Sequence, residues 1–257
     1  MIITNLTLTY PGKRTPTLKH LTWQIKPGEW LGITGSNGSG KTSLLYCLAG
    51  LIPKHIPAKI TGETLINQST GIVFQNPDFS LFNLTVKEEV AFGATTNVDQ
   101  ALKSVGIWRY KNTDPQTLSY GEKQKVCLAG VLARNPDIIF LDEPTAMLDY
   151  KSSLDLYELL AKLNRLGKTI VTVEHDTSLL LRFTQKALIL DKGKVAAFGQ
   201  TAKVWDRQRV VIIPDHYIFT ADSKSNRNVD ILREFVKEQG ITHFYDVIDD
   251  PAGTWKF

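Results

Sequence analysis

Short apolar runs recur along the chain and predict a set of β-strands. Residues 2–10 and 18–25 alternate apolar and polar side chains, and the turn PGKRTP separates them. A period of two is typical of half-buried strands. The later runs TGIVFQ, DIIFLDE, KTIVTVEH and KALILD are more continuously apolar and are bounded by polar or turn residues. Continuous apolar runs of this length indicate strands that are buried on both faces.

Segments with helical spacing lie between several of these strands. SLLYCLAGL follows a glycine-rich loop, and the leucines between 154 and 166 recur at helical intervals before Gly167, a residue that favours a helix C-terminus. Buried strands that alternate with helices predict an α/β fold with a mostly parallel sheet, complete by about Asp191. The early strands would add an antiparallel edge.

Composition narrows the class of protein. The 257 residues, with 42% hydrophobic and 22% charged side chains, are typical of a soluble globular protein with one large domain or a domain and an appendage. No apolar run approaches the roughly 18 to 20 residues of a membrane span, and the N-terminus alternates like a strand rather than a signal peptide. We therefore expect a cytoplasmic protein. The net charge of +4 is not concentrated in a basic run, so no nucleic-acid partner is expected.

The strongest chemical motif is the stretch GSNGSGKT. It lies after the predicted strand WLGIT and before the helical segment SLLYCLAGL, which is the context that a phosphate-binding loop requires. Glycines there allow successive N–H groups to turn inward and form an anion cradle at a helix N-terminus. Lys41 would reach the β- and γ-phosphates of ATP, and Thr42 would bind Mg²⁺. The residues of the loop are Gly35, Ser36, Asn37, Gly38, Ser39, Gly40, Lys41 and Thr42.

Two acids at the end of IIFLDE complete this picture. Buried strands of an open α/β sheet deliver the residues at their carboxyl ends to the same crevice as the phosphate loop. Asp142 suits Mg²⁺, and Glu143 is placed to orient or deprotonate a water that attacks the γ-phosphate. Adjacent acids are often merely solvated, but the phosphate loop upstream favours the catalytic interpretation.

The stretch LSYGEKQK permits two interpretations. Ser119 lies three residues before Glu122 and ahead of a helical run, a pattern that in isolation indicates a capping box. The other motifs of the chain raise a second possibility.

In this order, Tyr10, GSNGSGKT, Gln75, LSYGEKQK, IIFLDEPTAMLD and His175 resemble the ATP-binding subunit of ABC transporters over residues 1–203. This resemblance implies an ABC-type P-loop ATPase core that binds ATP and Mg²⁺, with a helical subdomain inserted between about 76 and 134. It also implies that Ser119 and Gly121 of one subunit close over ATP held by a second ATPase subunit, identical or not.

The same resemblance implies roles for four other residues. Tyr10 would stack on adenine, Gln75 would contact Mg²⁺ and the attacking water, Asp149 would link the two ATP sites, and His175 would contact the γ-phosphate. Each has a simpler alternative as an ordinary strand or surface residue.

Two positions depart from the family pattern. The signature Ser is usually followed by Gly-Gly-Gln, whereas this chain has Tyr120, Gly121 and Glu122. Gly121 keeps the close approach of backbone to phosphate. Tyr120 adds bulk and Glu122 adds negative charge near an anion, so we expect the closed dimer to bind more weakly.

The segment VFQNPDFSLFNLTVKEEVAFG looks like the ATPase subunits of energy-coupling factor transporters, which import vitamins and the metal ions cobalt and nickel. Phe79, Leu81, Phe82 and Leu84 would then line a groove for a cytosolic helix of an integral membrane subunit. The alternative is that these residues are core of the helical subdomain.

Residues 204–257 change character and are expected to form strand, helix and strand as a small appendage. They resemble a truncated N-terminal piece of the large subunit of 3-isopropylmalate dehydratase, a family that holds an iron–sulfur cluster with cysteines, and this segment contains none.

The function that follows is ATP hydrolysis that drives import through a separate membrane protein, with the chain peripheral on the inner face of the membrane. One rival is a soluble ABC ATPase that acts in DNA repair or translation, and a minor one is a lyase fragment. Neither a long coiled-coil insertion nor a second ATPase module is apparent in the sequence, which disfavours the first rival.

Overall fold

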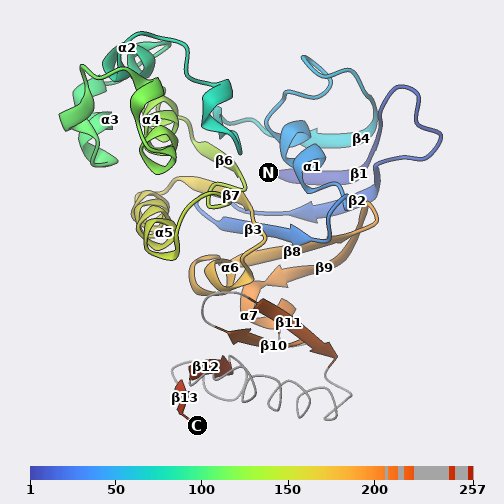
Figure 1. Ribbon diagram of the computed structural model, residues 1–257. Coiled ribbons are helices and arrows are strands. Elements are labelled where there is room, and N and C mark those ends of the chain that lie inside the picture. The colour runs from blue at the N-terminus through green and yellow to red at the C-terminus, as the bar shows by residue number, and fades with distance from the viewer. Residues whose placement is uncertain (206–207, 214–216, 223–242, 247–253, 257) are drawn as a thin grey trace.

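The computed structural model describes residues 1–205, 208–213, 217–222, 243–246 and 254–256 (Figure 1). Its centre is a six-stranded sheet in the order β5-β6-β7-β3-β8-β9. The strands are β5 (Thr70–Val73), β6 (Ile138–Asp142), β7 (Thr169–Val173), β3 (Trp30–Gly35), β8 (Lys186–Asp191) and β9 (Lys194–Gln200).

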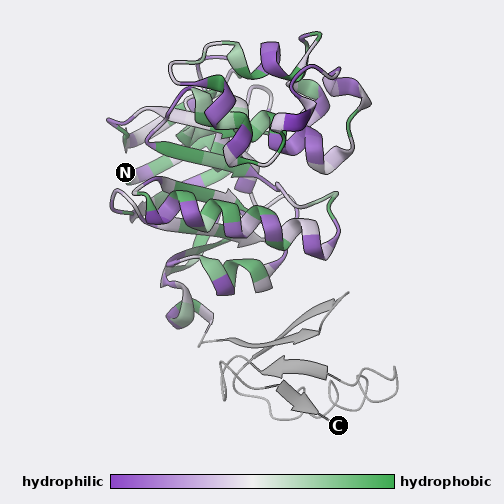
Figure 2. Cartoon of the chain, turned by 90° about the vertical axis from the view of Figure 1, so that its left-hand side faces the viewer, coloured by the Kyte–Doolittle hydropathy of each residue, from purple (hydrophilic) through white to green (hydrophobic). Residues whose placement is uncertain are grey.

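The first five of these strands are parallel, as the continuous apolar runs predict. Every residue of β6 and β7 is buried. Figure 2 shows the hydrophobic colour concentrated on these strands and alternating colours on the helices beside them. The expectation that the sheet ends at Asp191 is wrong, because β9 returns antiparallel to β8 and forms the edge strand.

The early strands form an antiparallel sheet of their own. Its order is β2 (Leu18–Gln24), β1 (Ile2–Thr9) and β4 (Lys59–Leu65). The inward side chains of this sheet pack with α1 (Lys41–Leu48) and with one face of the central sheet in a single apolar cluster. Phosphate-loop residues therefore lie at the start of a helix held between two sheets.

The opposite face of the central sheet is covered by helices. Ile139 and Leu141 of β6 face this side, whereas Ile138 and Phe140 face the small sheet, as the alternation along a strand requires. The helices that contribute to this second cluster include α4 (Tyr120–Ala133), α5 (Tyr150–Arg165) and α6 (Thr177–Phe183).

Helices occupy the stretch between 76 and 134, all of which the structure describes. They are η1 (Pro77–Phe79), α2 (Val86–Ala91), α3 (Val98–Ser104), η2 (Trp108–Tyr110), η3 (Pro115–Thr117) and α4. Thr85 begins α2 with a capping box, and Asn97 caps α3 by accepting from the Gln100 N–H. Among the residues that the structure describes, no helix is long and apolar enough to cross a lipid bilayer.

Beyond Gln200 the chain forms α7 (Thr201–Trp205) and then strands. Their antiparallel sheet has the order β11-β10-β12-β13. It contains β10 (Gln208–Ile213), β11 (Tyr217–Asp222), β12 (His243–Asp246) and β13 (Thr254–Lys256). The run RVVIIPDHYIFT, which the alternation of side chains predicts to be one strand, contains two strands, β10 and β11, that pair antiparallel. The amphipathic run NVDILREFVKEQG, residues 228–240, predicts a helix and lies outside the described residues.

Lys203 lies inside α7 rather than at an element boundary. Val204 and Trp205 are buried, at 5% and 4% exposure, and pack with Leu180 and Ala187. The last turn of α7 therefore belongs to the apolar packing of the ATPase core.

A chain that ends after Lys203 should be less stable than one that ends after Trp205. Loss of a buried Trp and Val removes apolar contacts, and we expect the free energy of unfolding to fall by about 3 to 5 kcal/mol. Urea unfolding of the two chains measures this difference. Equal midpoints would contradict the packing role of α7, and ATP turnover per folded molecule should be the same in both chains.

Candidate functional site

The phosphate loop joins the end of β3 to the start of α1, and its glycines are required by backbone geometry. Gly35 and Gly40 have φ values of 147° and 103°. A Cβ at Gly35 would collide with the Leu190 carbonyl, and one at Gly40 would lie 2.7 Å from Leu18 Cδ2. Gly38, at φ 74°, has open space around it, so there the dihedral alone favours glycine.

Lys41 is held inside this loop. Its Nζ donates to the carbonyl oxygens of Gly35 at 2.9 Å and Ser36 at 3.3 Å, and the residue is 6% exposed. Burial lowers the pKa of the ammonium, while the carboxylates of Glu143 and Asp142 act in the opposite direction. A buried cation held by weak neutral acceptors is well suited to an anionic ligand that enters the cradle.

Thr42 and Asp142 bring two hard oxygen donors together. Thr42 Oγ1 donates to Asp142 Oδ1 at 3.2 Å, and Asp142 is 2% exposed at the end of β6. Burial raises the pKa of the Asp142 carboxyl, and hydrogen bonds from Thr42 and Tyr46 partly offset this effect. A hydroxyl and a carboxylate beside a phosphate loop fit Mg²⁺, which prefers oxygen ligands and retains waters and phosphate oxygens.

The three predicted catalytic residues meet in one cluster. Glu143 Oε2 accepts from Gln75 Nε2 at 2.9 Å, and Glu143 Oε1 lies 2.9 Å from His175 Nε2. The Glu143 backbone has φ 45°, and its N–H donates to the Val173 carbonyl of β7. A carboxylate fixed by an amide on one side and an imidazole on the other can take a proton from a water placed before it.

Ser119 is the N-cap of α4, and the capping box predicted from the sequence is present. The Ser119 hydroxyl donates to Glu122 Oε2 at 2.8 Å and accepts from the Glu122 N–H at 3.4 Å. Bonds from Tyr110 and Ser119 and the positive charge of Arg109 lower the pKa of Glu122. Ser119 remains exposed, with the helix N-terminus behind it.

Tyr120 has a contact that sequence reasoning missed. Its hydroxyl donates to the Gln75 carbonyl oxygen at 2.5 Å, and Lys123 Nζ lies 2.6 Å from Asp78 Oδ1 one turn further along α4. The bulk that we expected to obstruct a dimer partner is therefore directed toward a loop of the same chain. A Tyr in this position of the pattern was the only signal, and spacing alone could not identify its acceptor.

Tyr10 and Asp149 have local partners. The Tyr10 hydroxyl donates to Ser43 Oγ at 3.0 Å, which places the ring beside α1. Asp149 caps α5 by accepting from the Ser152 N–H and hydroxyl, and these bonds lower its pKa. Asp149 is thus held on the segment after Glu143 rather than inside the Gln75–Glu143–His175 cluster.

Comparisons with known proteins identify the family of this chain. The ABC transporter family model matches residues 18–146. A putative ABC transporter ATP-binding protein of Pyrococcus horikoshii is 35% identical over 228 residues, which cover 79% of this chain and 80% of that protein. The energy-coupling factor transporter ATP-binding protein EcfA of Methanothermobacter thermautotrophicus is 35% identical, covering 78% of this chain and 71% of that protein.

Solved structures of ABC transporter proteins are also similar to this chain. The cbiO1 protein of Clostridium perfringens, part of the ABC transporter complex cbiONQ, has a TM-score of 0.69 and 32% identity, with coverage of 79% of this chain and 89% of that one. A dimeric ATP-binding cassette in a post-hydrolysis state with ADP and Pi has a TM-score of 0.67 and 32% identity, with coverage of 78% and 98%. The chain belongs to the family of ABC transporter ATP-binding proteins, and it is an ATPase.

The dehydratase resemblance of residues 204–257 finds no support in these comparisons, which match the ATPase part of the chain. Most of that segment lies outside the described residues.

Glu143→Gln should separate nucleotide binding from hydrolysis. The amide keeps the shape and the contact with Gln75 but loses the proton acceptor, so kcat should fall about 10²- to 10⁴-fold while ATP still binds. Steady-state turnover and equilibrium binding of ATP measure the two effects. Turnover at the parent rate would place the base elsewhere.

Proposed function

We propose that this chain is the ATP-hydrolysing subunit of an energy-coupling factor type importer, and that it lies on the inner face of the membrane bound to a separate membrane protein. The observation that supports this most strongly is the Gln75–Glu143–His175 cluster beside the phosphate loop. Relatives named as energy-coupling factor ATP-binding proteins and the cbiO1 structure support the transporter class.

ATP would bind with its phosphates in the loop from Gly35 to Thr42 and its adenine against Tyr10. Lys41 exchanges its bonds to loop carbonyls for β- and γ-phosphate oxygens. Mg²⁺ would be held by Thr42 and Asp142, with Gln75 beside it, and would supply positive charge to the phosphate oxygens.

In hydrolysis the chain's own groups move one proton. Glu143 accepts it from the attacking water, and the Gln75 amide orients that water. His175 donates a hydrogen bond from Nε2 to the γ-phosphate once the water and nucleotide separate His175 from Glu143. Gln75 and His175 both contact Glu143, so the three side chains are gathered at one place before nucleotide binds.

The site as described is half of a composite one. Ser119 and Gly121 would close over the ATP of a second ATPase subunit, with the positive end of α4 directed at its phosphate. Asp149 would link the two sites. Met147 and Tyr150, on either side of Asp149, are 70% and 58% exposed, which is consistent with a surface that a partner covers.

Mixing two inactive variants tests completion in trans. Ser119→Arg should fold, because the residue is exposed, and should block the seam with a large side chain. Lys41→Ala removes the loop cation. A heterodimer of the two contains one site with both lesions and one site with neither, so mixing should restore part of the ATPase rate. No recovery in proven heterodimers would reduce Ser119 to a helix cap.

The membrane partner would dock on an apolar surface that follows Gln75. Its side chains are Phe79, Phe82, Leu84 and Phe92, which are 87%, 66%, 82% and 55% exposed. Phe82 and Phe92 pack edge to face with centroids 5.2 Å apart. Leu81 is 5% exposed and belongs to the core of the helical subdomain, as one alternative for this segment predicts. Phe79, Phe82 and Leu84 are exposed, as the other alternative, a docking groove, requires.

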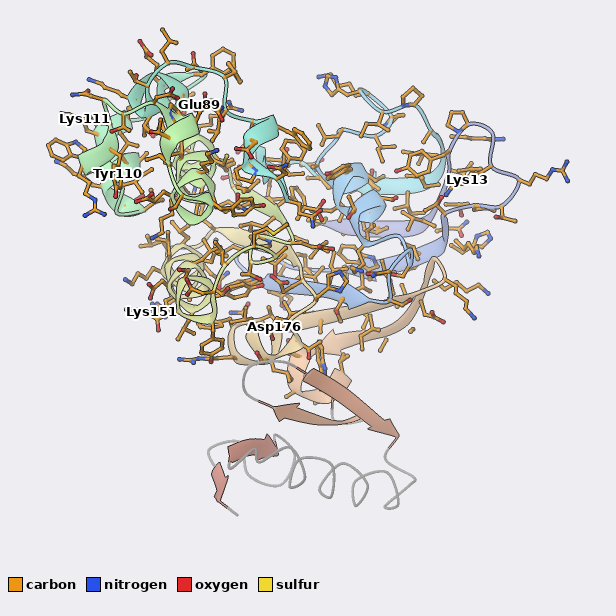
Figure 3. All side chains as sticks on the ribbon, in the orientation of Figure 1. Lys13, Glu89, Tyr110, Lys111, Lys151 and Asp176 are labelled. Carbon is orange, nitrogen blue, oxygen red and sulfur yellow. The ribbon has the colours of Figure 1, made fainter. Side chains whose placement is uncertain are left out.

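Glu89, labelled on α2 in Figure 3, holds this docking surface in place. One oxygen of its buried carboxylate accepts from the Phe82 N–H at 2.9 Å, the Asn83 N–H at 2.8 Å and Asn83 Nδ2 at 3.1 Å. A loop fixed in this way can present exposed aromatic rings without collapsing them onto the protein. A cytosolic helix with an apolar face is the occupant that such a surface fits.

Negative charge on the docking surface should abolish binding of the membrane partner without affecting ATP hydrolysis. The double variant Phe79→Glu and Leu84→Glu should leave the ATPase rate of the isolated chain unchanged. An integral membrane protein should no longer co-purify with this variant from solubilised membranes. The control is Leu166→Glu, which is equally apolar and 79% exposed at the end of α5. Equal losses in both variants, or retention by the double variant, would contradict this docking surface. Recovery of the parent with soluble repair or ribosomal proteins instead would favour the rival function.

A further inference from the structure

A buried carboxylate next to the catalytic cluster has no place in the proposed chemistry. Glu174 directly follows β7 and is 2% exposed. A carboxylate in such a position costs several kcal/mol of desolvation unless donors surround it. Burial raises the pKa of the Glu174 carboxyl to about 7, and bonds from Thr145 and from the backbone of His175 and Asp176 partly offset this.

The two oxygens of Glu174 bind two different elements. Oε1 accepts from the His175 N–H at 2.8 Å and from the Asp176 N–H at 3.4 Å, where Asp176 begins α6 (Figure 3). Oε2 accepts from the Thr145 hydroxyl at 2.6 Å and from the Tyr157 hydroxyl of α5 at 3.5 Å. The carboxylate therefore joins the loop that carries His175 to the segment that carries Glu143.

These contacts close a ring. The Glu143 side chain contacts His175 at 2.9 Å, the backbone of His175 is held by Glu174, and the other oxygen of Glu174 holds Thr145, two residues after Glu143. Side chains thus fix the separation of Glu143 and His175 twice, once by their own contact and once through Glu174, in addition to the backbone pairing of β6 with β7. When ATP and water part the first contact, Glu174 is the side chain that still joins the loop of His175 to the Glu143 segment, beside the backbone bond from the Glu143 N–H to the Val173 carbonyl.

We propose that Glu174 is a positioning residue, which holds the His175 backbone against the Glu143 segment while nucleotide separates the two side chains. This rests on the proposed roles of Glu143 and His175. Glu174 acts through His175 and Thr145, and it touches neither the nucleotide nor the water.

The first test compares two substitutions in the full chain. Glu174→Gln keeps an oxygen for the His175 N–H and places its amide toward the Thr145 hydroxyl, which can accept, so kcat should stay within about threefold of the parent. Glu174→Leu leaves the donors on both sides without an acceptor, and kcat should fall about 10- to 100-fold. The ATP dissociation constant should change less than about threefold in both, because the phosphate loop is untouched.

A milder variant keeps the test available if Glu174→Leu does not fold. Thr145→Val removes one hydroxyl at nearly constant shape, and kcat should fall about 2- to 10-fold. The control is Thr184→Val. Thr145 and Thr184 are both 8% exposed. The Thr184 hydroxyl donates to the Leu180 carbonyl at 2.7 Å, away from the site. The control should lose stability at unchanged kcat.

The decisive comparison uses a His175→Ala background. If Glu174 and Thr145 act through His175, then Glu174→Leu and Thr145→Val cause no further loss of kcat once His175 is absent. Losses that multiply in the double variants would make Glu174 a general structural residue and overturn the inference. Parent-like kcat in folded Glu174→Leu and in Thr145→Val would overturn it as well, with the proposed ATPase mechanism intact. Parent-like kcat in His175→Ala would instead refute the proposed role of His175 and the inference with it.

Discussion

The active-site geometry depends on the register of three parallel strands. Ile33 of β3 and Asp142 of β6 both pair with Val173 of β7. The carboxyl ends of β3, β6 and β7 therefore lie at one edge of the central sheet. There β3 leads into the phosphate loop, β6 into the Asp142–Glu143 pair and β7 into the Glu174–His175 pair. A slip of one residue in β7 would turn His175 to the other face of the sheet and remove it from Glu143. The apolar clusters on both faces set this register, because each strand alternates its side chains between them.

Charged side chains at this edge have hydrogen-bond partners within the chain. Lys41 bonds to loop carbonyls, Thr42 bonds to Asp142, and Glu143 is shared by Gln75 and His175. Such bonds hold the side chains near the positions in which ATP would need them. They are also replaceable, because a phosphate is a stronger partner for Lys41 than a carbonyl oxygen. The charged groups are thus held in place before nucleotide binds.

Sequence patterns predicted most strands of the central sheet, but they missed β4 and β9 and could not identify contacts between residues far apart in the sequence. The strand runs, the phosphate loop and the capping box at Ser119 depend on local spacing, and the structure has all of them. The hydrogen bond from Tyr120 to Gln75 joins positions far apart in the sequence, so the spacing of residues along the chain does not predict it. Glu174 is part of the strand run KTIVTVEH, but its burial depends on α5 and the Thr145 segment. The run KVAAFGQ is only partly buried and was not predicted to be a strand, because the pairing of β9 with β8 comes from the tertiary fold.

The central claim is that the loop between β3 and α1 binds the phosphates of ATP through Lys41. Calorimetric titration of ATP with Mg²⁺ into the full chain and into Lys41→Met tests it most directly, because Met keeps the length of the side chain and removes its charge. The account predicts one ATP per parent chain and an affinity at least about tenfold lower for the variant, equivalent to about 1.4 kcal/mol or more. Equal affinities in two folded proteins would contradict it.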